Sequence, residues 1–222
     1  MIFCEKVSKR FGEKFALRNV SFSFKKNLAV LGYNGAGKST LAKILAGIIK
    51  SDSGKVNVFG KDPSKSIEVR RKIGIVTHNP MVYKELTVEE NLRFFAKLYG
   101  IREWNWILEK LSLKGKLELR VLELSRGYLQ RLAIARAFMI KPSLLILDEA
   151  FTSLDIESRE VLWDLIHSFD GSLFLSTHNF EDVKFCEKFL VLKNGQVVYS
   201  GDCYDNAVNA LDLGTREERS QN

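Results

Sequence analysis

The chain has 222 residues, 45% of them hydrophobic and 27% charged, which is ordinary for a globular domain in water. This length suits one sizeable α/β domain, or one domain that carries a modest insertion. No apolar run approaches the roughly 20 residues that span a bilayer, and the first residues lack the layout of a signal peptide. The three cysteines are widely spaced and give neither a disulfide framework nor paired metal ligands. We therefore expect a protein of the reducing cytoplasm.

The net charge of +7 is unevenly distributed along the chain. Residues 1–75 hold 16 Lys and Arg against 5 Asp and Glu, whereas the remainder holds 18 against 22. A basic N-terminal part suits a polyphosphate ligand, and it also suits an anionic membrane surface or a nucleic acid. Charge alone leaves the choice among these partners open.

The N-terminal part predicts strands at 2–7, 15–24 and 28–31, and a glycine-rich loop follows at 32–40. Apolar residues then recur at helical spacing from Leu41 to Ile48. A glycine-rich loop between a strand and a helix directs backbone N–H groups at phosphate oxygens, and the helix dipole adds to the attraction. The order of strand, loop, Lys-Ser and helix disfavours a plain turn.

The two residues that follow the glycines give the loop its chemistry. Lys38 is placed to bind the terminal phosphates of a nucleotide, and the Ser39 hydroxyl is placed to hold Mg²⁺. The sequence therefore predicts a site for a nucleoside triphosphate.

Residues 80–140 are predicted to form a helical insertion, which follows further strands at 54–60 and 71–76. Thr87-Val88-Glu89-Glu90 is a capping box that begins a helix reaching about Tyr99. Helical patterns also cover 104–111 and 128–139, and Pro142 ends the latter.

The remaining elements alternate between strand and helix. Strands are predicted at 144–148, 172–176, 189–193 and 196–200, and helices at 157–167 and 181–186. We expect an α/β fold with a mainly parallel sheet, an antiparallel N-terminal β segment and the helical insertion. This single domain would cover 1–214, and a polar, frayed tail would cover 215–222.

An acidic pair, Asp148-Glu149, ends the apolar strand at 144–148. In proteins with a phosphate-binding loop, such an Asp lies beside the loop hydroxyl and helps to hold Mg²⁺. Glu149 is then placed to orient or deprotonate an attacking water. The alternative is that the pair caps the next helix, and the upstream phosphate loop makes the nucleotide role the favoured interpretation.

Leu124-Ser125-Arg126-Gly127-Tyr128 decides the family. Taken alone, these residues are a Ser cap and a Gly before an amphipathic helix, which makes another anion-binding helix N-terminus. Together with the phosphate loop and the acidic strand end, they resemble the signature sequence of ATP-binding-cassette (ABC) ATPases. The resemblance covers about residues 2–205, its motifs stand in the family order, and it implies a P-loop NTPase core.

The resemblance also implies a role for individual residues. The nucleotide would be bound by Phe11, stacking on adenine, and by the Walker A loop with Asn34, Gly35, Ala36, Gly37, Lys38, Ser39 and Thr40. Mg²⁺ would be held by Ser39 and Asp148, Glu149 would be the catalytic base, and His178 would reach the γ-phosphate. Taken singly, Phe11 could be a core residue and His178 a structural one.

Further residues would act on the nucleotide of a second cassette. Ser125 and Gly127 of the signature, and Asp155 in the loop Ser153-Leu154-Asp155, match the family's dimer interface. One chain therefore holds only part of each complete site, so the resemblance implies two cassettes that face head to tail around two ATP molecules with Mg²⁺.

The chain departs from the family pattern at two positions. His78 stands where the family usually has a Gln that contacts Mg²⁺ and the attacking water, so the resemblance implies that His78 is a metal-binding and catalytic residue. Arg126 replaces the first Gly of the signature, while Ser125 and Gly127 remain. These departures and the compact length resemble the export-type branch that includes the haem-export ATPase of cytochrome c maturation.

The family resemblance implies the ATP-hydrolysing subunit of a transporter, located in the cytoplasm and peripheral on the inner face of the membrane. Its partners would be a second cassette, as a homodimer or heterodimer, and a separate membrane permease, with no nucleic acid expected. The alternative is a soluble ABC ATPase that acts on ribosomes, nucleic acid or a cytosolic assembly machine. A single cassette without a heptad run favours the transporter, and the absence of GTPase motifs disfavours a GTPase.

Overall fold

The computed structural model describes residues 1–152 and 154–219, with side chains described as far as Leu211. The chain divides into two compact units. The first unit holds residues 1–70, 146–149 and the C-terminal part from Ser172, and the second holds 71–145 and 150–171. The second unit thus includes the predicted insertion at 80–140 and extends beyond it on both sides.

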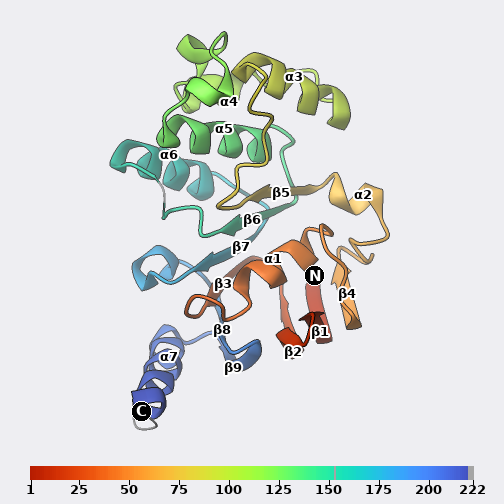
Figure 1. The fold of residues 1–222 in the computed structure, drawn as a ribbon, viewed down its shortest axis with the longest axis vertical. Coiled ribbons are helices and arrows are strands. Elements are labelled where there is room, and N and C mark those ends of the chain that lie inside the picture. Colours follow the sequence, from red (N-terminus) through yellow and green to blue (C-terminus); the bar gives the residue numbers. More distant parts are fainter. Residues whose placement is uncertain (153, 220–222) are drawn as a thin grey trace. The chain divides into compact units, whose positions relative to one another are not determined.

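An antiparallel sheet begins the first unit, as predicted for the N-terminal β segment (Figure 1). Its strands are β1 (Ile2–Phe11), β2 (Lys14–Phe24) and β4 (Ser53–Val58), in the order β2-β1-β4. β1 runs to Phe11, further than the predicted 2–7, because its register with β2 continues to the turn at Gly12 and Glu13. Gly12 has a φ of +59°, a left-handed conformation that glycine adopts without strain.

The second sheet of this unit is mainly parallel. It is formed by β3 (Asn27–Leu31), β6 (Leu144–Asp148, in this unit from Ile146), β7 (Ser172–Thr177), β8 (Lys188–Lys193) and β9 (Gln196–Gly201). The order is β6-β7-β3-β8-β9, with β3 parallel to β7 and β8, and β9 antiparallel to β8. The central strands are buried along almost their whole length, which explains their continuous apolar runs.

This sheet positions the candidate site. The glycine-rich loop follows β3, Glu149 follows β6 and His178 follows β7. Parallel strands end at the same edge of a sheet, so three segments far apart in sequence come together there, where α/β proteins bind ligands.

Helices complete the first unit. α1 (Lys38–Leu45) follows the glycine-rich loop, α2 (Ile67–Arg70) is a single turn, and α7 (Tyr204–Arg219) packs on β8 and β9. The predicted helix at 181–186 is instead a short 3₁₀ helix, η3 (Phe180–Val183). α7 continues through Arg219 and so enters the segment predicted as a polar tail, and residues 220–222 of that segment lie outside the described residues.

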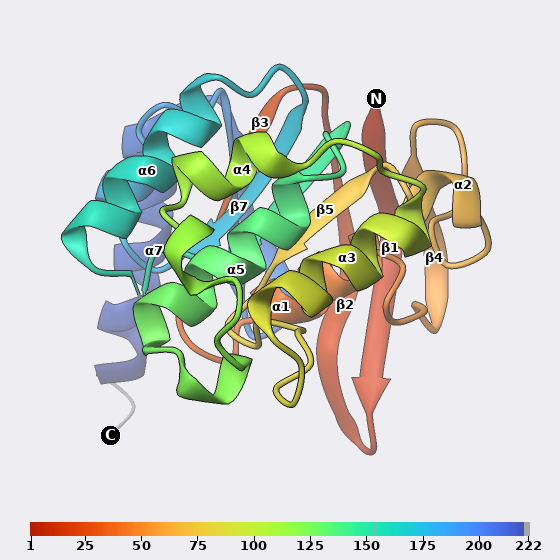
Figure 2. The ribbon, with the colours of Figure 1, turned by 90° about the horizontal axis from the view of Figure 1, so that it is seen from above.

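The second unit is mainly helical (Figure 2). It contains β5 (Ile73–Val76), the start of β6, and the helices α3 (Val88–Tyr99), α4 (Asn105–Lys110), α5 (Arg126–Phe138) and α6 (Ile156–His167). Two 3₁₀ turns, η1 (Lys114–Lys116) and η2 (Val121–Glu123), connect α4 to α5. The capping box of α3 is confirmed, because the Glu90 N–H donates to Thr87 Oγ1 and the Thr87 N–H donates to Glu90.

α5 is the central helix of this unit, and its residues from Gln130 to Phe138 are buried. The Arg136 guanidinium donates to the Ile75 carbonyl at 2.6 Å and lies over the Phe95 ring, 5.4 Å from its centroid. Burial lowers the pKa of Arg136, although an arginine at this depth remains charged. Arg136 thus ties α5 to β5 and α3, so the signature residues stand at the start of a fixed helix.

Candidate functional site

The glycine-rich loop is fixed between two other segments of the first unit. Gly37 has a φ of +106°, and a Cβ at this position would lie 2.5 Å from the Ala16 carbonyl oxygen of β2. On the other side, the Gly195 N–H in the β8–β9 turn donates to the Ala36 carbonyl at 3.1 Å. Only glycine at position 37 fits both the backbone conformation and the close approach of β2.

Lys38 is almost completely buried, with 4% of its side chain exposed. Its ammonium donates to the carbonyls of Gly32 at 2.6 Å and Tyr33 at 3.2 Å, and it lies 3.1 Å from Glu149 Oε1. A buried ammonium is stable only when it is paired and hydrogen-bonded. Carbonyls hold the positive charge at the start of α1, and the single carboxylate neutralises it.

Glu149 links Lys38 to His178. Its second oxygen, Oε2, lies 3.1 Å from His178 Nδ1. Partial burial works to raise the Glu149 pKa, but the hydrogen bond and charge of Lys38, followed by those of His178, hold the pKa below its ordinary value. Glu149 is therefore a carboxylate at neutral pH. It has a φ of +53°, rare for a non-glycine residue, and its N–H is held by the Ser176 carbonyl at 3.0 Å.

Asp148, at the end of β6, is buried and lies beside the loop. One of its oxygens, Oδ1, accepts hydrogen bonds from Ser39 Oγ at 3.0 Å and from Ser176 Oγ at 2.6 Å. The pairing of Ser39 with Asp148 across 109 positions of sequence agrees with the prediction that the two residues act together. Ser176 on β7 was not among the predicted site residues.

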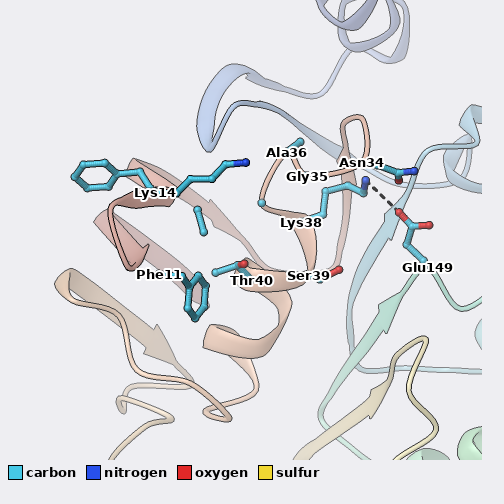
Figure 3. Close-up of a pocket in the computed structure, with 12 residues that line it drawn as sticks. Phe11, Lys14, Asn34, Gly35, Ala36, Lys38, Ser39, Thr40 and Glu149 are labelled. Carbon is cyan, nitrogen blue, oxygen red and sulfur yellow. Dashed lines mark ion pairs between the residues drawn. The ribbon is translucent and has the colours of Figure 1, made fainter.

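These side chains border a cavity of about 340 Å³ (Figure 3). Its lining comprises Phe11, Lys14, Phe15, Ala16, the loop residues from Asn34 to Thr40, and Glu149. Phe11 is 55% exposed, which excludes the alternative that it is a core residue. The cavity therefore has an aromatic ring on the β1–β2 hairpin and a loop rich in N–H groups. It also has the paired ammonium of Lys38 and carboxylate of Glu149.

Three further predicted residues gather in the second unit. Asp155 caps α6 by accepting from the Ser158 N–H at 2.7 Å, and a Cβ on Gly127 would lie 2.7 Å from Asp155 Oδ2. Ser125 caps α5, accepting from the Tyr128 N–H. The hydrogen bonds of Ser158 lower the Asp155 pKa, and the Arg131 charge adds to this.

Arg131 was not a predicted site residue, although it holds this group together. It donates to Ser158 Oγ at 2.7 Å and lies 3.7 Å from Asp155 Oδ1. Of the remaining predictions, Ser153 lies outside the described residues. His78 is exposed on the loop after β5 in the second unit, so its contact with a nucleotide site stays a prediction.

Sequence reasoning missed those side chains whose role depends on a neighbour. Ser176 is part of an apolar strand pattern, and Lys14 follows a turn in a region rich in lysine. Their importance is visible only when β6 and β7, or β1 and β2, are paired.

Comparisons with known proteins agree with this geometry. The family model for ABC transporters matches residues 17–152. The Nod factor export ATP-binding protein I of Rhizobium etli is 34% identical over 212 residues, which cover 90% of this chain and 67% of that protein. The protein of the same name from Bradyrhizobium diazoefficiens is also 34% identical, with 88% of this chain and 68% of the relative covered.

Solved structures give the same result. An ATP-binding subunit of an ABC transporter matches with a TM-score of 0.84 and 28% identity, over 95% of this chain and 94% of the other. A dimeric post-hydrolysis structure of an ATP-binding cassette with ADP and Pi matches with a TM-score of 0.80 and 25% identity, over 91% and 98%. The predicted P-loop NTPase fold is confirmed. The chain belongs to the ABC transporter family, is one of its ATPases, and has export ATP-binding proteins among its relatives.

Proposed function

We propose that this chain is the ATP-hydrolysing subunit of a membrane exporter, bound to the cytoplasmic face of the membrane through a separate permease. The observation that supports this chemistry is the convergence of three side chains: Lys38 and Glu149 line the cavity as a pair, and His178 contacts the second oxygen of Glu149. Within the described residues, no helix is long and apolar enough to cross a membrane. The names of the relatives, Nod factor export ATP-binding proteins, support export as the direction of transport.

The cavity indicates how a nucleotide is oriented. The base packs on Phe11, the phosphates lie along the loop from Asn34 to Thr40, and the terminal phosphate points toward Glu149. Aromatic stacking does not select among bases, because every base has a π-face. The choice of ATP therefore rests on the family.

Lys38 has two competing partners in this scheme. It pairs with Glu149 in the structure, and the same ammonium is the cation that binds terminal phosphates in such loops. Phosphate binding thus draws Lys38 away and leaves Glu149 to accept a proton from the attacking water. His178 Nδ1 lies 3.1 Å from the other oxygen of Glu149, and in this scheme its imidazole contacts the terminal phosphate.

The residues at the loop fit a magnesium ion. Ser39 Oγ and Asp148 Oδ1 are oxygen donors 3.0 Å apart at the start of α1, and Mg²⁺ in nucleotide sites is typically held by one or two protein oxygens together with phosphates. Ser39 would bind the ion directly, and Asp148 would hold it through a water molecule. When bound, Mg²⁺ neutralises charge that develops on the phosphate oxygens.

We further propose that two copies, or this chain and a related cassette, face head to tail around two ATP molecules. Ser125, Gly127 and Asp155 would then contact the nucleotide held on the partner's loop. The dimeric solved relatives support this arrangement. ATP stabilises the closed dimer through contacts with both chains, and hydrolysis removes that link.

The surface for the permease is proposed on α3. Tyr83, Phe94 and Leu98 are 48%, 41% and 54% exposed, which is unusual for large apolar side chains. The Tyr83 and Phe94 rings lie 5.0 Å apart, and Phe94 and Phe95 lie 5.2 Å apart, so they form one cluster. An exposed aromatic cluster suits an apolar helix from a partner.

Loss of the Ser176 hydroxyl should weaken magnesium binding. We expect Ser176→Ala to raise the Mg²⁺ concentration for half-maximal ATPase activity by about tenfold, because a group that orients a metal ligand is typically worth 10–100-fold. Ser172→Ala is the matched control, since Ser172 lies on the same strand but donates to the Lys25 carbonyl. Equal magnesium requirements in both variants would contradict the proposal that Ser176 orients Asp148 toward the metal.

The proposed roles of Glu149 and Lys38 predict different defects, one in ATP hydrolysis and the other in ATP binding. Glu149→Gln should lower steady-state ATP hydrolysis by at least about 100-fold, the usual contribution of a general base, while ATP binding persists. Lys38→Ala should weaken ATP binding itself, because the phosphates lose their buried cation. Phosphate release and equilibrium ATP binding are measured on the same samples. Glu149→Gln protein that hydrolyses ATP at the wild-type rate would contradict the assignment.

The exporter proposal is tested by identifying the proteins that co-purify with this chain. Glu149→Gln protein is cross-linked in native cells with ATP present, gently solubilised and purified, and its partners are identified by mass spectrometry. We expect a membrane protein with several spans in roughly equal amount, and we expect its recovery to fall in the additional Phe94→Ala variant. Val198→Ala, which removes an exposed apolar residue on β9, is the control. Recovery of ribosomes or soluble proteins alone would contradict the proposal.

A further inference from the structure

We propose that Lys14 is a second phosphate-binding cation of the site, and that it contacts the α-phosphate of the nucleotide from the β1–β2 hairpin. This inference rests on the proposed binding of a nucleotide between Phe11 and Glu149. It adds a binding residue that lies outside the glycine-rich loop and that the motif analysis did not identify.

The register of the hairpin places Lys14 beside Phe11. The two residues are direct partners in the antiparallel pairing of β1 and β2, at the last position before the turn. Side chains of directly opposed residues lie on the same face of a sheet, with Cβ atoms about 5 Å apart. Both residues line the same cavity. One hairpin therefore brings an aromatic ring and an ammonium to the same cavity, which suits the base and a phosphate of one nucleotide.

The same strand is fixed to the phosphate loop. Two residues after Lys14 on β2, the Ala16 carbonyl lies against Gly37. The Arg18 N–H donates to the Gly195 carbonyl at 2.7 Å, and Gly195 in turn donates to Ala36 of the loop. These contacts hold the hairpin next to the loop. In Figure 3 the Lys14 side chain extends from the hairpin toward the Gly35–Ala36 part of the loop.

Lys14 differs from the neighbouring cations in having no partner. Lys9 pairs with Asp52 at 2.7 Å, and the guanidinium groups of Arg10 and Arg18 stack on Phe15 at 4.8 and 4.6 Å from its centroid. In the part of the chain that the structure describes, the Lys14 ammonium makes neither an ion pair nor a hydrogen bond. Its charge is thus available to an anion in the cavity.

The order of groups along the cavity selects the phosphate. Phe11 marks the end that holds the base, and the pair of Lys38 and Glu149 marks the end that holds the terminal phosphate. Lys14 belongs to the hairpin that carries Phe11, so it meets the nucleotide next to the nucleoside. The first phosphate there is the α-phosphate. Lys14 and Lys38 would then hold the two ends of the polyphosphate chain.

The test compares Lys14→Ala with Lys25→Ala. Lys25 is an exposed lysine just after the other end of β2 and does not line the cavity, so its replacement removes the same charge away from the site. Dissociation constants for ATP and ADP are measured by calorimetry, and those for AMP and adenosine by competition. We expect Lys14→Ala to weaken ATP, ADP and AMP by the same factor of about ten, the size of one charge-assisted hydrogen bond, and to leave adenosine unchanged. Lys14→Arg should retain most of the affinity.

Three results overturn the inference. One is equal nucleotide affinity of Lys14→Ala and Lys25→Ala, with thermal unfolding confirming that both are folded. Another is a loss that grows from AMP to ATP and disappears at high salt, because that indicates a diffuse charge effect without contact. A wild-type protein that binds none of the nucleotides would overturn the proposed function, and this inference with it.

Discussion

The buried ammonium of Lys38 is the constraint on which the site depends. An unpaired charge at 4% exposure is costly, so the fold must surround it with acceptors, which here are two loop carbonyls and Glu149. Those acceptors come from the ends of parallel strands that are distant in sequence. The left-handed backbone of Glu149 and the contact of Gly37 with β2 are the local strains that this convergence requires. In the proposed scheme, a phosphate that enters the cavity replaces the carboxylate of Glu149 beside Lys38.

The same arrangement explains why the site is incomplete in one chain. The first unit supplies the aromatic ring, the loop, the proposed magnesium ligands and the proposed catalytic carboxylate, whereas Ser125, Gly127 and Asp155 form a separate group in the second unit. Arg131 fixes that group by joining α5 to the cap of α6. A helix N-terminus with a serine cap and a glycine attracts anions, and on the proposed scheme its anion belongs to the partner cassette. On the same scheme, binding energy from ATP is converted into association of two chains.

Sequence reasoning succeeded where a local pattern determines the structure. The glycine-rich loop, the capping box of Thr87 and Glu90, and the buried run that ends at Asp148 each carry their own physical signal, and all have the predicted structure. It failed where pairing or packing decides. The hydroxyl of Ser176 and the ammonium of Lys14 gain meaning from a neighbouring strand, the segment at 181–186 has too few residues to sustain an α-helix, and the helicity of α7 depends on its packing against β8 and β9.

The molecular mass of Glu149→Gln protein in solution tests the central claim most directly. Sedimentation is measured with Mg²⁺ and ATP, with Mg²⁺ and ADP, and without nucleotide. The account predicts a dimer with ATP and a monomer in the other two conditions, because only the terminal phosphate connects the loop of one chain to the signature of the other. A protein that binds ATP and remains monomeric at every concentration would contradict the account.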